Sequence, residues 1–143
     1  MFKIFSIGLV LALLTVPVAA ETMITCGASE GYAYYLPQGL TGKVKAGWEK
    51  DKVSIGSIAL TKNGNKVDIL FKDVLGHLKS ASSNGAKVTL LGFEAPNVTV
   101  LASYKETMVE IYTFDLKGKN LVWSQHKYGT LLNKGATYFA KCY

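Results

Sequence analysis

Apolar and polar residues alternate along most of this chain after residue 21, which is the pattern of half-buried β-strands. The clearest case is a predicted hairpin that joins an apolar run at Val53–Leu60 to the alternating residues Val67–Phe71. Between them lies Asn63-Gly64, a pair that suits a tight turn with positive φ. This part of the chain is therefore predicted to form an antiparallel hairpin.

The same pattern predicts a second hairpin and several further strands. The second hairpin is formed by Met108–Leu116 and Leu121–Lys127, with a short polar loop between them. The remaining strands are expected at Lys87–Phe93, from Val98 to near Tyr104, and at Thr137–Cys142.

Two segments break the alternation. In Asp73–Ser80 the apolar residues have helical spacing and Asp73 is placed to cap, which predicts one helical turn or a loop. Gly129–Gly135 is expected to be a loose connection, with room for a short helical turn at Leu131-Leu132.

Together these elements amount to six or seven short strands separated by turn signals. This organisation predicts an all-β domain, an antiparallel meander that forms a small barrel or sandwich with at most one short helical turn. Some strands are apolar on both faces, as in Val88 and Leu90 against Leu91 and Phe93. Such strands are expected to be covered on both sides or to line a closed interior.

The first twenty residues follow a different pattern. A basic start at Lys3 precedes an apolar run and the small residues Ala19-Ala20, which is the layout of a secretory signal peptide. The apolar run is shorter than the roughly 20 residues that a membrane-spanning helix needs. We therefore expect residues 1–20 to be a signal peptide and residues 21–143 to be one exported domain, periplasmic or extracellular, with no membrane span.

The two cysteines lie near the two ends of that domain. In an exported protein Cys26 and Cys142 are expected to form one disulfide that joins the two termini. The alternative is a lipid-modified Cys26, but Thr25 is not the small residue that such processing prefers directly before the cysteine. Two thiols are too few for a structural zinc site.

Charge narrows the range of partners. The 143-residue chain has a net charge of +6, and all 16 basic residues are lysine. Arginine is the preferred side chain for bidentate contacts to phosphate and guanine, so a nucleic-acid partner is not expected. The lysines are scattered, which indicates a solvated surface or a loose attraction to an anionic envelope.

No catalytic or metal-binding motif is present, and no cofactor is expected. His77 and His126 lack a His-x-x-x-His partner, and no serine lies in a Gly-x-Ser-x-Gly motif. Two acidic pairs are interpreted as surface charge rather than as the opposed carboxylates of a glycosidase, namely Glu49 with Asp51 and Glu106 with Glu110.

The aromatic residues are the most suggestive candidates for binding, because exposed rings stack on sugars or anchor protein partners. The simpler interpretation is that Trp123 packs in the core and that the tyrosine run is an ordinary edge strand. The candidate binding residues are Tyr32, Tyr34, Tyr35, Trp48, Trp123 and Tyr128.

Several segments taken together resemble a group of uncharacterised small exported bacterial proteins, mostly proteobacterial. They are Cys26 with Gly31-Tyr32-Ala33-Tyr34-Tyr35, Gly47-Trp48, Asp68-Ile69-Leu70-Phe71-Lys72-Asp73, Glu110-Ile111-Tyr112-Thr113-Phe114 and Trp123-Ser124-Gln125. The resemblance implies an export signal and a terminal cysteine pair, and no known activity. Periplasmic lysozyme inhibitors of the small β-barrel type are similar in size, export and terminal cysteines, but their Ser-Gly-x-x-Tyr segment is absent.

These observations favour a non-enzymatic exported domain that binds a protein, a glycan or a small apolar ligand. Two alternatives remain open. One is a small envelope hydrolase centred on His77 or His126, and the other is a structural or stress-related envelope protein without a tight ligand.

Overall fold

The computed structural model describes residues 19–39, 47–54, 56–73 and 75–143. The described residues form strands joined by turns and contain no helix. The strands are β1 (Glu21–Gly39), β2 (Gly47–Val53), β3 (Ile58–Asn63), β4 (Lys66–Lys72), β5 (Leu78–Ser80), β6 (Ala86–Glu94), β7 (Asn97–Tyr104), β8 (Met108–Asp115), β9 (Asn120–Lys127) and β10 (Leu132–Cys142). The predicted signal peptide falls almost wholly outside the described residues.

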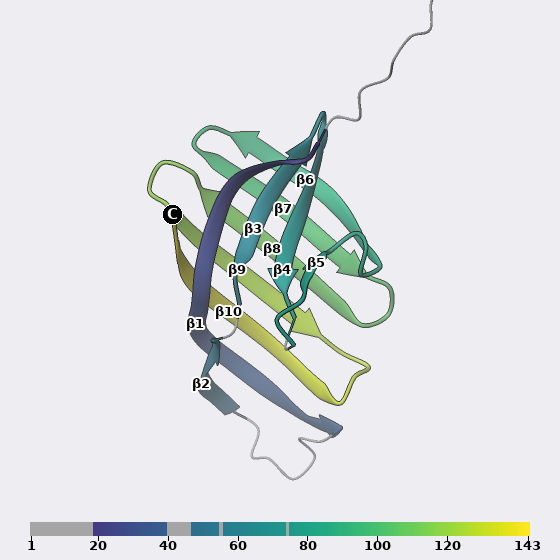
Figure 1. The fold of residues 1–143 in the computed structure, drawn as a ribbon. Helices are drawn as coiled ribbons and strands as arrows, with labels where there is room; N and C mark the ends of the chain where they lie inside the picture. Colours follow the sequence, from purple (N-terminus) through teal and green to yellow (C-terminus); the bar gives the residue numbers. More distant parts are fainter. Residues whose placement is uncertain (1–18, 40–46, 55, 74) are drawn as a thin grey trace, which may run out of the picture.

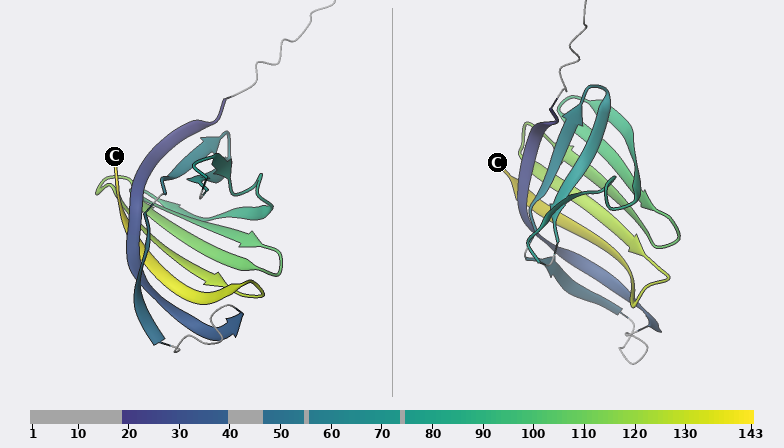
Figure 2. Two further views of the ribbon diagram at one scale, coloured as in Figure 1. Left: turned by 60° about the horizontal axis from the view of Figure 1, so that its bottom comes forward. Right: turned by 45° about the vertical axis from the view of Figure 1, so that its right-hand side comes forward.

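All ten strands belong to one antiparallel sheet that curls into a half-barrel (Figures 1 and 2). The strand order is β5-β4-β3-β1-β10-β9-β8-β7-β6, and β2 pairs with β1 beside β3. The meander from β6 to β10 therefore closes onto the first strand. The all-β prediction is confirmed, with more strands than the six or seven expected.

The core lies on the inner side of the curl. Alternate residues of β7 show this clearly, because Val98, Val100 and Ala102 are fully buried while Leu101 between them is not. The period of two puts successive side chains on opposite faces of a strand. The largest fully buried side chains are Tyr138, Phe114, Leu60, Ile69, Leu121, Val98 and Val100.

Both predicted hairpins are present, and Gly64 has the expected positive φ of 59°. The predicted strand Val53–Leu60 is wrong in one respect, because it is interrupted between the end of β2 and the start of β3. The helical turn considered at Leu131-Leu132 is also absent, since Leu132 already begins β10. Alternation alone does not show whether a strand is continuous or whether it breaks and pairs with a different strand.

The segment after β4 begins with a turn, one of the outcomes expected for Asp73–Ser80, but the prediction is wrong for its last three residues, which form strand β5. The carboxylate of Asp73 accepts hydrogen bonds from the backbone N–H groups of Leu75 and His77, both at 2.9 Å. Asp73 therefore caps a turn, as its position suggested.

The tyrosine run does not lie on an edge strand. β1 pairs with β10 on one side and with β3 and then β2 on the other, so it is central to the sheet. Gly31 marks the closest approach of β1 to β10, because a Cβ atom there would lie 2.8 Å from the Cα of Tyr138 and closer still to the carbonyl oxygen of Thr137.

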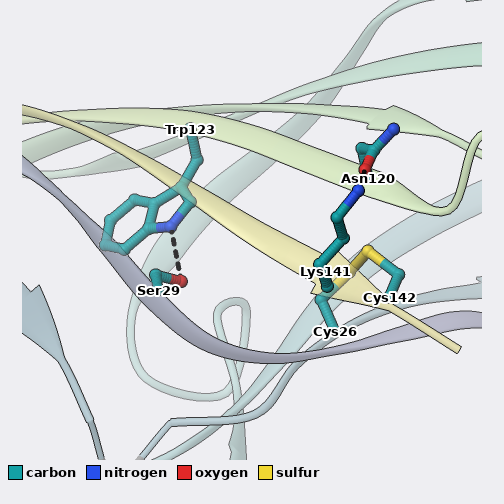
Figure 3. Close-up of a disulfide and its surroundings, with 6 residues drawn as sticks. All are labelled: Cys26, Ser29, Asn120, Trp123, Lys141 and Cys142. Carbon is teal, nitrogen blue, oxygen red and sulfur yellow. Dashed lines mark hydrogen bonds between the residues drawn. A yellow bond between two sulfur atoms is a disulfide. The ribbon is translucent and has the colours of Figure 1, made fainter.

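The disulfide is formed between the first and last strands, as expected (Figure 3). Cys26 and Cys142 are direct register partners in the β1–β10 ladder. A few residues along β1, the hydroxyl of Ser29 accepts a hydrogen bond of 3.1 Å from the indole N–H of Trp123 on β9, which ties β9 to β1.

Candidate binding site on the outer face

The alternation of side chains along β1 turns two of the three tyrosines of its run outward. Glu30, Tyr32 and Tyr34 alternate with Gly31 and the buried Ala33, so their side chains lie on the outer face. Tyr32 is 55% exposed. Across the ladder, the β1 register places Lys50 of β2 on one side of Tyr32 and Thr137 of β10 on the other.

A groove of about 780 Å³ runs over this part of the outer face. Tyr32, Phe139 and Val122 supply its apolar surface, and Phe139 and Val122 are direct partners across β10 and β9. The last two side chains are 41% and 49% exposed. The floor passes over the backbone of Gly31.

Charged side chains surround the apolar part of the groove. Lys50 and Lys52 project from β2, and Glu30 lies opposite Lys52 in the β1–β2 ladder. Beyond Phe139, the ammonium group of Lys141 lies 5.3 Å from the centre of the Phe139 ring and is held by Asn120. The groove therefore has an apolar centre and a mostly basic rim.

A second aromatic pair lies one step along the same face. The rings of Tyr34 and Trp48 meet edge to face with centroids 5.6 Å apart, and Trp48 is 68% exposed. Gly135 lies opposite Tyr34 in the ladder, and the imidazole of His126 lies beside that glycine. We call Tyr32, Tyr34, Trp48 and Phe139 the outer aromatic patch.

The other candidate aromatics do not join this patch. Trp123 is 5% exposed and stacks in the core between Tyr112 and Tyr138, with ring centroids 5.5 and 4.4 Å away. Tyr35 points to the inner side, where it packs against the core. Tyr128 is exposed, but it lies beyond the end of β9 and does not line the groove.

Below the groove, on the inner side, a polar network fixes β2 against β10. The carboxylate of Asp51 accepts hydrogen bonds from the ammonium of Lys134 at 2.5 Å and from the hydroxyl of Tyr138 at 2.7 Å. Burial by itself raises the pKa of Asp51, but these two donors outweigh it, so the net pKa is lowered. This network holds the β2 side of the groove in place.

Glu110 forms a second buried polar cluster in the core. Its carboxylate accepts hydrogen bonds of 2.7 Å from the hydroxyl of Tyr112 and from the side-chain amide of Gln125. Burial raises the pKa of Glu110, and the two donors only partly offset that effect. The interpretation of Glu110 and Asp51 as surface charges is therefore wrong, because each accepts hydrogen bonds on the inner side of the sheet.

In the described residues, the two histidines are not arranged with the partners that a catalytic site would need. His77 lies 3.5 Å from the carboxylate of Asp73 on an exposed loop, and that carboxylate also binds Lys79 and two backbone N–H groups. Within the described residues, neither His77 nor His126 has a hydrogen bond to a serine. The same part of the chain contains no group of three or more His, Cys, Asp or Glu side chains that could hold a metal ion.

No helix in the described ranges is long and apolar enough to cross a membrane. Comparisons of the chain with protein-family models, curated proteins and solved structures found no match. The candidate site is therefore defined by its own residues.

Sequence reasoning identified three members of the outer aromatic patch, Tyr32, Tyr34 and Trp48, but missed Phe139 and Val122. Both lie on strands that the alternation predicted, at the polar positions of the pattern, where an apolar residue is exposed. The sequence signal for both residues is an apolar side chain at a position where alternation predicts an outward direction.

Proposed function

We propose that this chain is an exported, non-enzymatic binding domain that contacts a protein partner through the groove on its outer face. The observation that supports this most is the groove itself, in which the exposed Tyr32, Phe139 and Val122 form one apolar surface. Single exposed apolar residues are ordinary, but a contiguous group with a polar rim is typical of an interaction site.

The composition of the groove favours a protein partner. Protein interfaces combine a buried centre rich in aromatic residues with a polar rim, and tyrosine and tryptophan are frequent energetic hot spots. Here the centre is aromatic, the rim carries Lys50, Lys52 and Glu30, and Lys141 lies beyond Phe139. The partner is therefore expected to present an apolar centre flanked by acidic side chains.

The inner side of the sheet favours this function over that of a carrier. A carrier of a small apolar ligand needs an enclosed apolar cavity. Over the central strands of the described part of the chain, the inner side is filled by large buried side chains, among them Tyr138, Phe114 and Leu60, whereas beside the edge strand β6 it is open to solvent. We accordingly propose a binding surface on the outside of the sheet.

Two features support export. The N-terminal pattern is that of a signal peptide, and a disulfide such as Cys26–Cys142 persists in oxidising compartments. The same compartment is where we expect the partner.

A photo-crosslinking residue in place of Val122 tests the proposal in the host cell. We expect a specific protein to be captured from position 122 and not from a matched control at Leu131, which is exposed outside the groove. Excess wild-type protein should compete for the partner, whereas the Tyr32→Ala/Phe139→Ala variant should compete at least tenfold less well.

Both substituted side chains in that variant are exposed, so its fold should be retained and circular dichroism would verify this. If the wild-type protein bound a glycan and this variant did not, the ligand of the groove would be a sugar rather than a protein. Capture that does not depend on Tyr32 and Phe139 would reject the groove as the site.

A further inference from the structure

The sheet has three free edges in the described part of the chain, and they differ in character. β2 presents the charged run Glu49-Lys50-Asp51-Lys52, and β5 is only three residues long. Charged side chains and short strands are the usual means by which proteins prevent edge-to-edge pairing. These two edges are therefore protected.

β6 is the third free edge and lacks both protections. It is nine residues long and is paired only with β7. Between Lys87 and Glu94 it has no charged residue, and Leu90, Leu91 and Phe93 are 40%, 53% and 54% exposed. The expectation that this doubly apolar strand would be covered on both sides or would line a closed interior is wrong for this reason.

The register explains why this exposure is unusual. Leu90 and Phe93 pair with Val100 and Val98, both fully buried on the inner face, so they point to the same inner side. A bulge at Leu91 keeps them on that side. They are exposed because no strand follows β6 in the sheet, which leaves the inner face uncovered at this end.

The space beside this edge is open. A trough of about 820 Å³ separates β6 from β4, lined on one side by Val88, Thr89 and Leu90. Side chains of Lys66, Val67 and Asp68 line the other side. An added strand would therefore meet unpaired backbone groups of β6 without first displacing a strand of the same chain.

We propose that two copies of this chain associate through β6, paired antiparallel across a two-fold axis. The end charges of the strand are self-complementary, since an antiparallel pair that places Lys87 of one copy opposite Glu94 of the other does so twice. The same register places Val88 opposite Phe93 and brings the exposed leucines to the centre. Cross-strand pairs of opposite charge and of apolar side chains stabilise such a ladder.

Pairing of this kind uses the free edge of both copies, so association stops at two. It also leaves the outer groove on β1, β9 and β10 accessible in each copy. A dimer would thus present two equal binding surfaces, which raises the avidity for a repetitive or multivalent partner.

Sedimentation equilibrium of the disulfide-bonded domain across micromolar to millimolar concentration tests the proposal. We expect a monomer–dimer equilibrium that Leu91→Lys shifts toward monomer at least tenfold, while Leu75→Lys, on an exposed loop, leaves it unchanged. Circular dichroism would verify that both variants fold.

The charge pair provides a sharper test. Lys87→Glu alone and Glu94→Lys alone should each weaken self-association, because like charges would then face each other. A mixture of the two single variants should form a heterodimer, since each Glu would again meet a Lys. The proposal would be overturned if the protein stayed monomeric at millimolar concentration or formed assemblies larger than a dimer. It would also be overturned if Leu91→Lys and the charge changes left the dimer equally stable.

Discussion

Two carboxylates on the inner side of the sheet, the half-buried Asp51 and the buried Glu110, have pKa values shifted in opposite directions. Asp51 is held by the ammonium of Lys134 and the hydroxyl of Tyr138, which lower its pKa despite partial burial. Glu110 has only neutral donors, Tyr112 and Gln125, and burial raises its pKa. The deeper burial of Glu110 and the positive charge of Lys134 beside Asp51 together account for the opposite directions.

These shifts predict opposite pH dependences of stability. For Glu110 the folded pKa is raised, so its contribution is present below the ordinary glutamate pKa and is lost as pH rises through the folded value. The free energy of unfolding of wild type relative to Glu110→Gln should therefore be greatest in acid and fall toward neutral pH. Urea unfolding followed by tryptophan fluorescence from pH 4 to pH 7.5 would measure it.

Asp51 provides the matched comparison. Its folded pKa is lowered, so its contribution is present above the ordinary aspartate pKa and is lost as pH falls through the folded value. Wild type relative to Asp51→Asn should therefore be most stable at neutral pH and lose that advantage in acid. The same sign for both variants would contradict the assignment of the two environments.

At the scale of elements, the approach of β1 to β10 depends on one glycine. A Cβ atom at position 31 would collide with backbone atoms of Thr137 and Tyr138, which cannot move aside as a flexible side chain could. We expect Gly31→Ala to lower the free energy of unfolding by about 3 kcal/mol, at the upper end of overpacking effects. Thermal or urea unfolding would measure the change.

Gly47→Ala is the control for this prediction, because a Cβ atom there has no neighbour within 4 Å. It should change the free energy of unfolding by less than about 0.5 kcal/mol. Equal losses at Gly31 and Gly47 would show that backbone freedom, rather than the close approach of the strands, is responsible.

Local patterns predicted the strands better than they predicted the neighbours of each strand. Asn63-Gly64 and the alternation around it indicated a hairpin correctly, because turn chemistry and burial act over a few residues. The interpretation of the tyrosine run as an edge is wrong because β1 is central, and pairing between β1 and β10 joins residues about a hundred positions apart. Nothing local distinguishes a central strand from an edge.

The candidate site shows the same limit. Tyr32 and Tyr34 form a cluster that is visible in the sequence, and their outward direction follows from alternation. Phe139 joins Tyr32 in the groove only through the register of β10, which depends on the closure of the whole sheet. Glu110 was assigned to the surface because a glutamate in a strand is usually solvated, and its donors come from the neighbouring residues Tyr112 and Gln125.

At the scale of the whole molecule, the disulfide connects the two ends of the folded domain. Cys26 and Cys142 are 116 positions apart, so the bond closes nearly all of the domain into a loop. In the chain-entropy account, a loop of this size stabilises the folded state by about 4–5 kcal/mol. We expect the double variant Cys26→Ala/Cys142→Ala to lose that amount in urea unfolding.

Wild type treated with a reductant should unfold at the same urea concentration as the double variant. Adding reductant to the double variant should leave the urea concentration at which it unfolds unchanged. If the variant matched oxidised wild type, the bond would not be a significant constraint on the unfolded chain.

The pairing of β1 with β10 also sets the order of events while the chain is being made. β1 is among the first described segments to leave the ribosome, and its principal partner β10 is the last. Until β10 emerges, β1 has only β2 and β3 to pair with, and the ring stack of Trp123 on Tyr138 cannot form. A nascent chain of this topology therefore stays incompletely folded until β10 has been synthesised.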